Sequence, residues 1–229
     1  MYLCEGILLI YPEDNQRSKM REDKIASIDL SSGKIEVQRI DRKIARSYFG
    51  GRGLGVKLLI DSMAGGIDPL SAENLLIFAV GSLTGIAPMS GRHAVVSKSP
   101  LTMTIFDSSA GGFFGAELRR CGFSAIVLKG AADSPTYVAI HNDEIEIRNG
   151  AELWGLNVKE TGRMLSKQGR VACIGKAGER LIKLANIMSD GAHACGRGGL
   201  GAVMGSKKLK AIVVNGSARL SPVNEAEYH

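Results

Sequence analysis

The sequence predicts an α+β fold in which β-hairpins alternate with short helices. Alternating apolar and polar residues surround a turn at Ser32-Gly33 and another at Asn142-Asp143, so each half of the chain carries a hairpin signal. A Gly-Gly pair followed by a short helical segment occurs at Gly50 and again at Gly111. This echo is faint, but it indicates a duplicated α+β unit. Hairpins mixed with short helices do not form the pattern of a regular βαβ array.

In the first half, the alternation predicts strands near 25–30 and 34–39. Asp41 is a typical N-cap for a helix over 42–49, which ends at Gly50-Gly51. Leucines at 54, 58 and 59 share one face of a second helix over about 54–62. Apolar runs predict strands at 74–80 and 93–97. Gly111-Gly112 then opens a helix over about 113–121, and a strand follows at 125–128.

In the second half, strands at 136–141 and 144–148 form the hairpin, and periodicity predicts a helix over 157–167. A strand at 170–174 precedes a helix or irregular turn around 184–188, and the last strand covers 210–214. Three lysines lie beside this last strand, and we interpret them as a solvated edge: Lys207, Lys208 and Lys210.

Glycine is densest between Gly191 and Gly205, in the stretch GAHACGRGGLGAVMG. Glycine lets backbone N–H groups approach a bulky ligand, and successive amides form a concave nest for anions. His193 and Arg197 lie within the run, and the stretch from Gly91 to Gly115 reads as a facing wall. A lone Gly pair is more often a turn. Because the clusters recur, and several carry an arginine, we expect a cradle for a large anionic ligand.

Composition narrows the class of protein. The chain has 229 residues, 45% hydrophobic and 23% charged, which is typical of a soluble folded protein, and we expect a cytoplasmic one. A net charge of +6 permits anionic partners, but aromatic content is only 5% and nucleic-acid binding is not favoured. No apolar run is long enough to span a bilayer, and the N-terminus lacks the features of a signal peptide. The scattered cysteines, expected to be buried, have no metal-ligand spacing: Cys4, Cys121, Cys173 and Cys195.

Two nucleotide-binding motifs fit poorly. Gly196, Gly198 and Gly201 match a dinucleotide fingerprint literally. That motif requires a strand before it, a helix after it and an acid about 20 positions on, whereas the sequence suggests a preceding helix and places Arg219 near the acidic position. A P-loop fails because Ser206 follows Gly205 where lysine is needed.

Few side chains are candidates for acid or base catalysis. His93 lies on a predicted strand and reads as structural, whereas His141 belongs to a hairpin and is expected to be exposed. His193 lies in the cradle and can donate to an anionic oxygen. Glu117 and Glu179 follow glycine-rich turns, but no pair of carboxylates and no nucleophile with a base stands out. The chain therefore reads as a binder of a cofactor.

Several motifs in fixed order resemble the N-terminal domain of the tungsten-containing aldehyde ferredoxin oxidoreductase family. They are FGGRGLGVKLL, NLLIFAVGSLTG, SGRHAVVSKSPLT, DSSAGGFFGAELRRCGFSAIVLKG, LWG, IGKAGERLIKLANIM and GRGGLGAVMGSKKLKAIVVNG. The resemblance covers about 24–216, which leaves 1–23 as an extension and 217–229 as the start of a linker or a truncated tail. It implies an α+β domain of two similar β-rich halves, forming a platform under tungsten or molybdenum held by two pterin dithiolenes whose phosphates share a magnesium ion.

The resemblance also implies the contact residues. Arg92 matches an arginine that contacts the pterin, and Ser109 to Gly111 match an asparagine-containing segment, with Ser109 where asparagine is common. His193 and Ala194 match an Arg-Ala pair, so histidine replaces arginine, and Arg197 lies in the glycine run that follows. The backbone carbonyls of Ser109 and Ala194 would be the magnesium ligands, since that ion prefers hard oxygen.

Family members continue into domains that carry a [4Fe-4S] cluster, and this chain has no cysteine spacing for one. The resemblance implies an enzyme that oxidises small aldehydes to carboxylic acids with ferredoxin as acceptor. We expect the chain to be inactive by itself and to need the further domains or a partner chain, whose absence would leave an apolar face that promotes association, including homo-oligomers. The alternatives are a non-catalytic module that binds a pterin or a partner, and, on charge alone, an RNA-binding protein.

Overall fold

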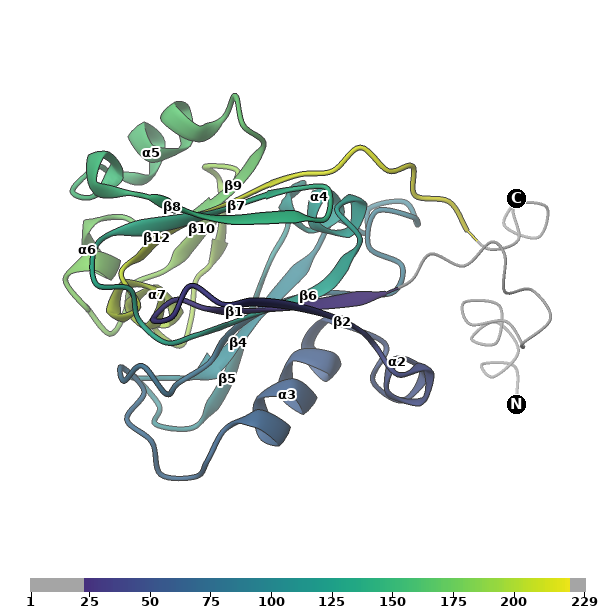
Figure 1. Ribbon diagram of the computed structural model, residues 1–229, viewed down its shortest axis with the longest axis horizontal. Helices are drawn as coiled ribbons and strands as arrows, with labels where there is room; N and C mark the ends of the chain where they lie inside the picture. The colour runs from purple at the N-terminus through teal and green to yellow at the C-terminus, as the bar shows by residue number, and fades with distance from the viewer. Residues whose placement is uncertain (1–22, 223–229) are drawn as a thin grey trace.

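A computed structural model describes residues 23–222 and shows two six-stranded β-sheets with short helices (Figure 1). This confirms the predicted α+β class. The first sheet contains, in spatial order, β2 (Ile35–Arg39), β1 (Lys24–Asp29), β6 (Phe123–Lys129), β3 (Leu76–Val80), β4 (His93–Lys98) and β5 (Ile105–Ala110). The second contains β11 (His193–Cys195), β10 (Ile187–Ser189), β9 (Arg170–Cys173), β12 (Leu209–Asn215), β7 (Thr136–His141) and β8 (Glu144–Asn149).

The two sheets have the same connectivity. In each, an N-terminal hairpin is followed by three antiparallel strands, and the last strand inserts parallel to the first: β6 beside β1, and β12 beside β7. The register is also equivalent, since Ile25 pairs with Ala125 in one sheet and Tyr137 with Ala211 in the other. The two similar halves are therefore an internal duplication.

The sequence retains a trace of this duplication at the end of each half. FGAELRRCGFSAIVLKG, residues 114–130, aligns without a gap with LGAVMGSKKLKAIVVNG, residues 200–216. Each segment forms a helix and then the inserted strand: α4 (Phe114–Arg120) before β6, and α7 (Leu200–Ser206) before β12. With the same offset, Gly112 corresponds to Gly198 and Gly111 to Arg197. The echo between Gly50 and Gly111 is not the repeat, because both positions belong to the first half.

The helices are arranged in layers around the sheets (Figure 1). α3 (Gly51–Ser62) covers the outer face of the first sheet, where Leu54 and Leu59 pack on Ile77 and Val96. α5 (Val158–Leu165) covers the outer face of the second sheet, together with the short 3-10 helix η2 (Ala151–Leu153). α4 and α7 supply residues to the large core that joins the two sheets. The main core therefore lies between the halves and fixes them against each other.

Local sequence explains where two of the helices begin. Asp41 caps α2 (Arg42–Tyr48), as predicted, because its carboxylate accepts hydrogen bonds from the backbone N–H groups of Lys43 and Ile44. Asn157 starts α5 with a capping box in which the Asn157 and Glu160 side chains each accept from the other's backbone N–H. Within the described residues, no helix is long and apolar enough to cross a membrane.

The structure decides between the two alternatives predicted for residues 184–188. They form the irregular turn and not the helix, and the turn leads into β10, a strand not predicted there, which starts at Ile187. A short helix lies earlier, α6 (Lys176–Glu179), and a short strand, β11, lies inside the glycine run. Three-residue strands leave too little periodicity to be detected from sequence.

The interpretation of the lysine cluster as a solvated edge is wrong for two of its members. Lys207 and Lys210 are fully buried. The Lys207 ammonium donates to the carbonyl oxygens of Gly130 (3.0 Å) and Ala72 (3.3 Å), both in the first half, and burial lowers its pKa to about 8. Lys210 forms an ion pair with Glu179 and donates to the Leu156 carbonyl at 2.7 Å. Both lysines are buried because acceptors distant in sequence satisfy them.

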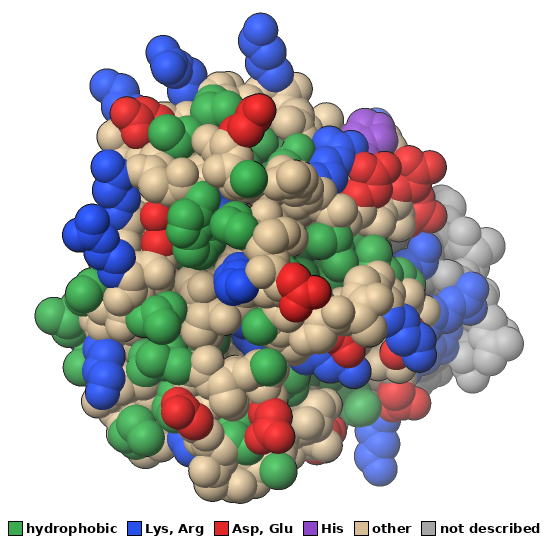
Figure 2. All heavy atoms as spheres, turned by 60° about the vertical axis from the view of Figure 1, so that its left-hand side comes forward, with side chains coloured by type: hydrophobic (Ala, Val, Ile, Leu, Met, Phe, Trp, Pro, Cys, Tyr) green, Lys and Arg blue, Asp and Glu red, His purple; other side chains and the backbone are tan. Residues whose placement is uncertain are grey.

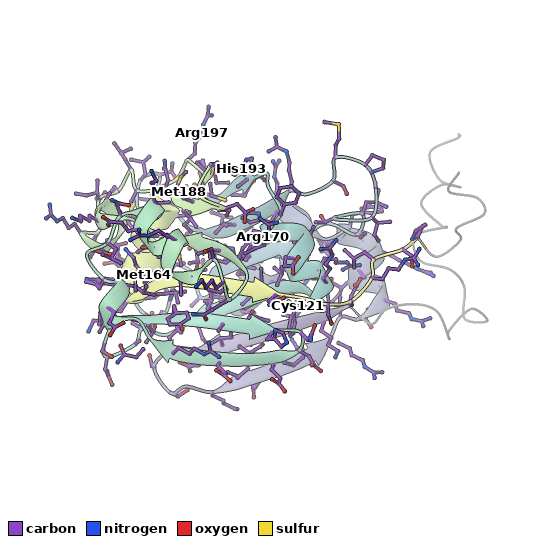
Figure 3. The ribbon with its side chains drawn as sticks, turned by 90° about the horizontal axis from the view of Figure 1, so that it is seen from above. Cys121, Met164, Arg170, Met188, His193 and Arg197 are labelled. Carbon is purple, nitrogen blue, oxygen red and sulfur yellow. The ribbon has the colours of Figure 1, made fainter. Side chains whose placement is uncertain are left out.

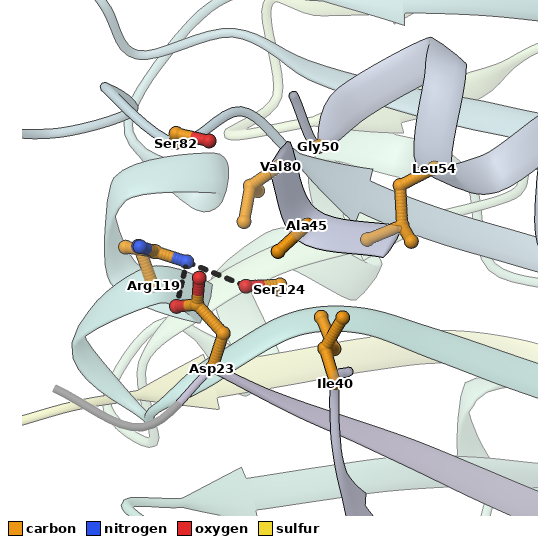
Figure 4. Close-up of a pocket in the computed structure, with 9 residues that line it drawn as sticks. All are labelled: Asp23, Ile40, Ala45, Gly50, Leu54, Val80, Ser82, Arg119 and Ser124. Atoms are coloured by element: carbon orange, nitrogen blue, oxygen red, sulfur yellow. Dashed lines mark hydrogen bonds and ion pairs between the residues drawn. The ribbon is translucent and has the colours of Figure 1, made fainter. Parts of the chain in front are cut away.

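The position equivalent to Lys210 in the first half takes part in a different group of polar contacts. Ser124 occupies the place of Lys210, and its hydroxyl lies 2.5 Å from the Arg119 guanidinium, which also pairs with Asp23 at 2.6 Å (Figure 4). Apolar side chains, including those of Ile40 and Leu54, line a small pocket beside these contacts. Because the charged groups of the pocket are already paired with each other, we interpret it as part of the packing of the fold and not as a ligand site.

Candidate functional site

The edge strands of the two sheets, β5 and β11, pack against each other and bring distant glycine segments together. The backbone N–H of Arg197 donates to the Ser108 hydroxyl at 3.3 Å. The Ser99 hydroxyl donates to the Gly198 carbonyl at 2.6 Å. These bonds join the first half to the second, so that residues 90–92, 109–113 and 190–197 converge. We call these three segments the cradle.

Close approach of neighbouring segments explains two glycines of the cradle, Gly91 and Gly112. A Cβ on Gly112 would lie 2.6 Å from both Asp190 Oδ2 and His193 Cδ2, and the residue has a φ of +83° that glycine adopts without strain. A Cβ on Gly111 would lie 3.5 Å from His193 Nδ1. A Cβ on Gly91 would overlap the Gly112 carbonyl oxygen. Glycine at positions 91 and 112 therefore allows the three segments to meet at this separation, whereas the contact at Gly111 is an ordinary one.

Asp190 fixes the second half to the start of α4. One carboxylate oxygen, Oδ2, accepts hydrogen bonds from the backbone N–H groups of Phe113 (2.7 Å) and Phe114 (3.0 Å). Sequence reasoning missed this residue. A carboxylate directly before a glycine run was the available signal, but its partners lie more than 70 positions away and could not be inferred.

The cradle carries more positive than negative charge. Arg92, His193 and Arg197 are exposed, and among residues 23–222 neither Arg92 nor Arg197 forms an ion pair. The Arg170 guanidinium lies over the Phe113 ring, 4.7 Å from its centroid. Figure 3 shows His193 and Arg197 along the same edge, with Arg197 directed away from the body of the molecule.

The predicted site residues all lie within the three segments of the cradle. The structure brings Gly111 beside His193, and β11 places Ala194 in the same edge strand as His193. Ser109 is half-buried on β5, opposite Ala94 on the neighbouring strand. Arg92 lies in the 90–92 segment and Arg197 at the end of the 190–197 segment, and both side chains are exposed.

The glycine run does not face a ligand along its whole length. Gly198, Gly199, Gly201 and Gly205 are buried, and a Cβ on any of them would overlap protein atoms. The exposed part of the run is therefore 191–197, apart from the buried Cys195. The remainder packs α7 against neighbouring backbone.

The local context of the dinucleotide fingerprint also differs from the prediction. A strand, β11, does precede it and a helix, α7, does follow. However, β11 is separated from β12 by two strands and pairs antiparallel with β10, so the unit is not βαβ. Arg219 still stands near the acidic position. The fingerprint therefore remains excluded on topology.

His93 is buried below the cradle, in agreement with its structural interpretation. Its ring forms a cluster with Phe78 and Phe114, whose centroids lie 6.2 and 5.0 Å from it and 6.0 Å from each other. Its Nε2 lies 3.2 Å from the Ser189 hydroxyl and 3.8 Å from the Cys195 sulfur, whereas Nδ1 has no partner among the described residues. Burial, and to a smaller extent the charge of His193, lowers the pKa of His93 to about 4.

The buried imidazole is expected to make the fold less stable in acid. Its folded pKa of about 4 lies below the ordinary value of 6.5, so between these values the unfolded chain binds more protons. This contribution is complete above pH 6.5 and is lost as pH falls toward 4. At about 1.4 kcal/mol per pH unit, we expect a loss of about 2 kcal/mol between pH 6.5 and about pH 5. Urea unfolding of the wild type and of His93→Gln measures it; equally steep losses in both would contradict this prediction.

The described cysteines are buried, as predicted, and Cys4 lies outside the described residues. Burial raises the pKa of Cys173 to about 11 and that of Cys195 to about 12. His141 is exposed, as predicted. Within 23–222, no group of three or more His, Cys, Asp or Glu side chains could hold a metal ion. The oxygen and nitrogen groups that the cradle offers a ligand therefore come mainly from backbone and cationic side chains.

Exposed apolar side chains flank the buried Gly198-Gly199 pair. Gly199 lies against Pro100 and Lys183, so the turns on its two sides meet there. These turns expose Leu101, Met103, Ile105, Leu181, Ile182 and Leu184. Figure 2 turns this side of the molecule forward and shows hydrophobic side chains interspersed with Lys and Arg. That this apolar surface promotes association stays a prediction.

Comparisons by sequence and by structure both find known proteins that are similar to this chain over most of its length. A tungsten-containing aldehyde ferredoxin oxidoreductase of Pyrococcus furiosus is 50% identical over 196 residues, and one of Pyrococcus horikoshii is 45% identical over 211 residues. These alignments cover 83% and 90% of this chain, but 32% and 35% of the relatives. The chain therefore spans about a third of the length of these curated relatives.

A solved structure is also similar: the active-site complex BamBC of benzoyl coenzyme A reductase, in complex with 1,5-dienoyl-CoA, has a TM-score of 0.85 and 38% identity. The match covers 88% of this chain and 32% of that chain. A family model described as "Aldehyde ferredoxin oxidoreductase, N-terminal domain" matches residues 25–216. With a match over most of its length, the chain belongs to the aldehyde ferredoxin oxidoreductase family and represents its N-terminal domain.

Proposed function

We propose that this chain is the cofactor-binding platform of an oxidoreductase that oxidises aldehydes to carboxylic acids and passes the electrons to ferredoxin. The observation that carries the proposal is the cradle itself, where two exposed arginines, which form no ion pair with any residue of 23–222, flank glycine backbone at the junction of the halves. The relatives' names supply tungsten, aldehyde and ferredoxin. In the reaction, water supplies the added oxygen and two electrons leave the aldehyde, one to each of two ferredoxins.

The cradle suits an anionic pterin cofactor. Arg92 and Arg197 offer planar guanidinium groups, which bind phosphate bidentately, and the glycine backbone admits a ring system without side-chain obstruction. When bound, a tungsten centre carried by two pterin dithiolenes would supply two-electron redox chemistry. The role proposed for this chain is to bind and orient that cofactor through Arg92, Ser109, Gly111, His193, Ala194 and Arg197.

Magnesium is proposed to bind the backbone carbonyls of Ser109 and Ala194. Both residues lie on edge strands, β5 and β11, where part of the backbone is not used by a neighbouring strand. Carbonyl oxygen is a hard ligand suited to this ion, and side-chain identity then matters little. This explains how alanine can occupy one of the two positions.

His193 takes the position where the family resemblance implies arginine. Beside the negative charge of Asp190, which approaches the same glycine, an imidazole can donate a hydrogen bond but lacks the permanent charge of a guanidinium. Arg92 and Arg197 therefore carry the permanent charge of this cradle.

Replacing Arg92 with alanine is expected to release tungsten from the assembled enzyme. Loss of a charge-assisted hydrogen bond to a phosphate corresponds to about a tenfold or greater drop in cofactor affinity. Tungsten per chain after exhaustive dialysis, measured by plasma mass spectrometry, tests this. Arg163→Ala is the matched control, because Arg163 is an exposed arginine on α5 with no part in the cradle. Equal tungsten content in both variants would remove Arg92 from the site.

Iron–sulfur chemistry is assigned to other parts of the enzyme. Since the described residues contain no cluster of suitable ligands, we propose that further domains or a partner chain supply a [4Fe-4S] cluster and the contacts with ferredoxin. A similar domain occurs in the active-site complex of a benzoyl coenzyme A reductase, whose name gives a different substrate. This similarity supports the proposal that substrate choice lies in the parts that complete the site.

A further inference from the structure

A buried polar cluster joins the two halves directly below the cradle. His93 belongs to β4 of the first sheet, and its two polar neighbours, Ser189 and Cys195, belong to β10 and β11 of the second. All three residues are at most 1% exposed. This contact connects the two sheets within their apolar core. Because a hydrogen bond depends on angle as well as on distance, it restricts both the spacing and the orientation of the strands that it joins.

Each member of the cluster is the chain neighbour of a residue that belongs to the cradle. The three neighbouring pairs are Arg92 and His93, Ser189 and Asp190, and Ala194 and Cys195. One peptide unit is too short to absorb a shift of an ångström without rotating the neighbouring backbone. A displacement of His93 relative to the second sheet would therefore move the segments of the cradle relative to one another.

The chemistry of the cluster excludes direct participation in a reaction. Burial lowers the pKa of His93 to about 4, so its imidazole is neutral near pH 7. None of the three side chains reaches solvent. The role left for the three side chains is to hold the two sheets in position relative to each other.

The geometry also assigns the donor. Nδ1 of His93 has no partner among the described residues, and a buried N–H without an acceptor is rarer than an unsatisfied acceptor. The proton is therefore assigned to Nε2, which donates to the Ser189 hydroxyl 3.2 Å away. The rings of Phe78 and Phe114 pack around the imidazole and restrict its rotation.

We propose that His93 is a positioning residue for the cofactor platform, which through Ser189 and Cys195 sets the spacing between the Arg92 segment and the segment from Asp190 to Ala194. This inference rests on the proposed function, because its readout is retention of the cofactor. It differs from a general role in stability, since the same loss of stability elsewhere in β4 should leave the cradle unchanged.

Three substitutions isolate the hydrogen bond in the assembled enzyme. His93→Phe keeps an aromatic ring beside Phe78 and Phe114 but removes the donor, whereas His93→Gln restores an N–H near the position of Nε2. Ser189→Ala removes the same bond from the acceptor side, which keeps the test valid if His93→Phe does not fold.

The matched control is Ser97→Ala. Ser97 is also fully buried on β4, near the end of the strand opposite to His93, and its hydroxyl donates to the Leu75 carbonyl at 2.6 Å. This substitution therefore removes a buried hydrogen bond from the same strand, but not from the cluster. For every variant, the rate of tungsten loss on dialysis and the denaturation midpoint are measured together.

We expect tungsten to be lost about fivefold faster from His93→Phe and Ser189→Ala, the change that one buried hydrogen bond produces, with most of the retention restored in His93→Gln. Ser97→Ala should lower the denaturation midpoint without changing the rate. Wild-type retention in His93→Phe or Ser189→Ala, or parallel loss in Ser97→Ala, would overturn the positioning role. A wild-type enzyme that holds no tungsten would instead overturn the proposed function, and the positioning role with it.

Discussion

Replacing Glu179 with leucine is expected to lower the free energy of unfolding by about 3–5 kcal/mol, because it leaves a buried ammonium group without its counter-charge. Lys210 is fully buried, and among the described residues it also donates to the carbonyl oxygen of Leu156. The Glu179 carboxylate also accepts from the backbone N–H of Gly155 at 3.0 Å, so the pair anchors the loop before α5. Urea unfolding of the purified chain measures the loss.

A double variant separates lost charge pairing from lost packing. With Lys210→Met added to Glu179→Leu, neither charge remains, and the free energy of unfolding should return to within about 1 kcal/mol of the wild type. The remaining difference comes from the Gly155 N–H, which has lost its acceptor Glu179. A double variant as unstable as the single one would show that packing, and not the unpaired charge, causes the loss.

Replacing Gly205 with alanine is expected to destabilise the fold by about 3 kcal/mol, near the upper end for overpacking. A Cβ at Gly205 would overlap the backbone carbonyl of Gly178, and backbone cannot rotate aside as a side chain can. Gly178 in turn packs against the Gly201 carbonyl. Glycines on both helices therefore let α6 and α7 pack backbone to backbone beneath the cradle.

Gly162→Ala provides the matched control. Gly162 lies within α5, and a Cβ there would meet no atom within 4 Å. Alanine is favoured over glycine in a helix by about 1 kcal/mol, so this variant should be more stable than the wild type. Thermal unfolding of both variants decides the matter, and a Gly205→Ala protein as stable as Gly162→Ala would contradict the close approach of α6 and α7.

Local patterns made much of the fold predictable. The hairpins, the Asp41 cap and the helix after Gly112 depend on residues a few positions apart, which a single sequence displays directly. The true repeat was missed because its halves align only over the last helix and strand of each. The Gly-Gly pairs at Gly50 and Gly111 are more alike, but both belong to the first half. Detecting it required the strand order, which is set by contacts distant in sequence.

The candidate site was predictable in composition but not in arrangement. Sequence identifies Gly111 and Gly199 alike as glycines in dense clusters, yet the first lies beside His193 in the cradle and the second packs against Lys183. The buried lysines were likewise misjudged because their acceptors come from other elements. Burial of a charge depends on partners that a local pattern does not show.

The most direct test of the platform is the metal content of the protein purified natively with everything that accompanies it. Plasma mass spectrometry, combined with fluorescence of the oxidised pterin released by acid, measures both parts of the proposed cofactor. Tungsten or molybdenum in stoichiometric amounts with this chain, accompanied by pterin and by iron from the parts that complete the enzyme, is the result that we predict. A natively purified protein that contains neither metal nor pterin would contradict the assignment of the cradle as a cofactor site.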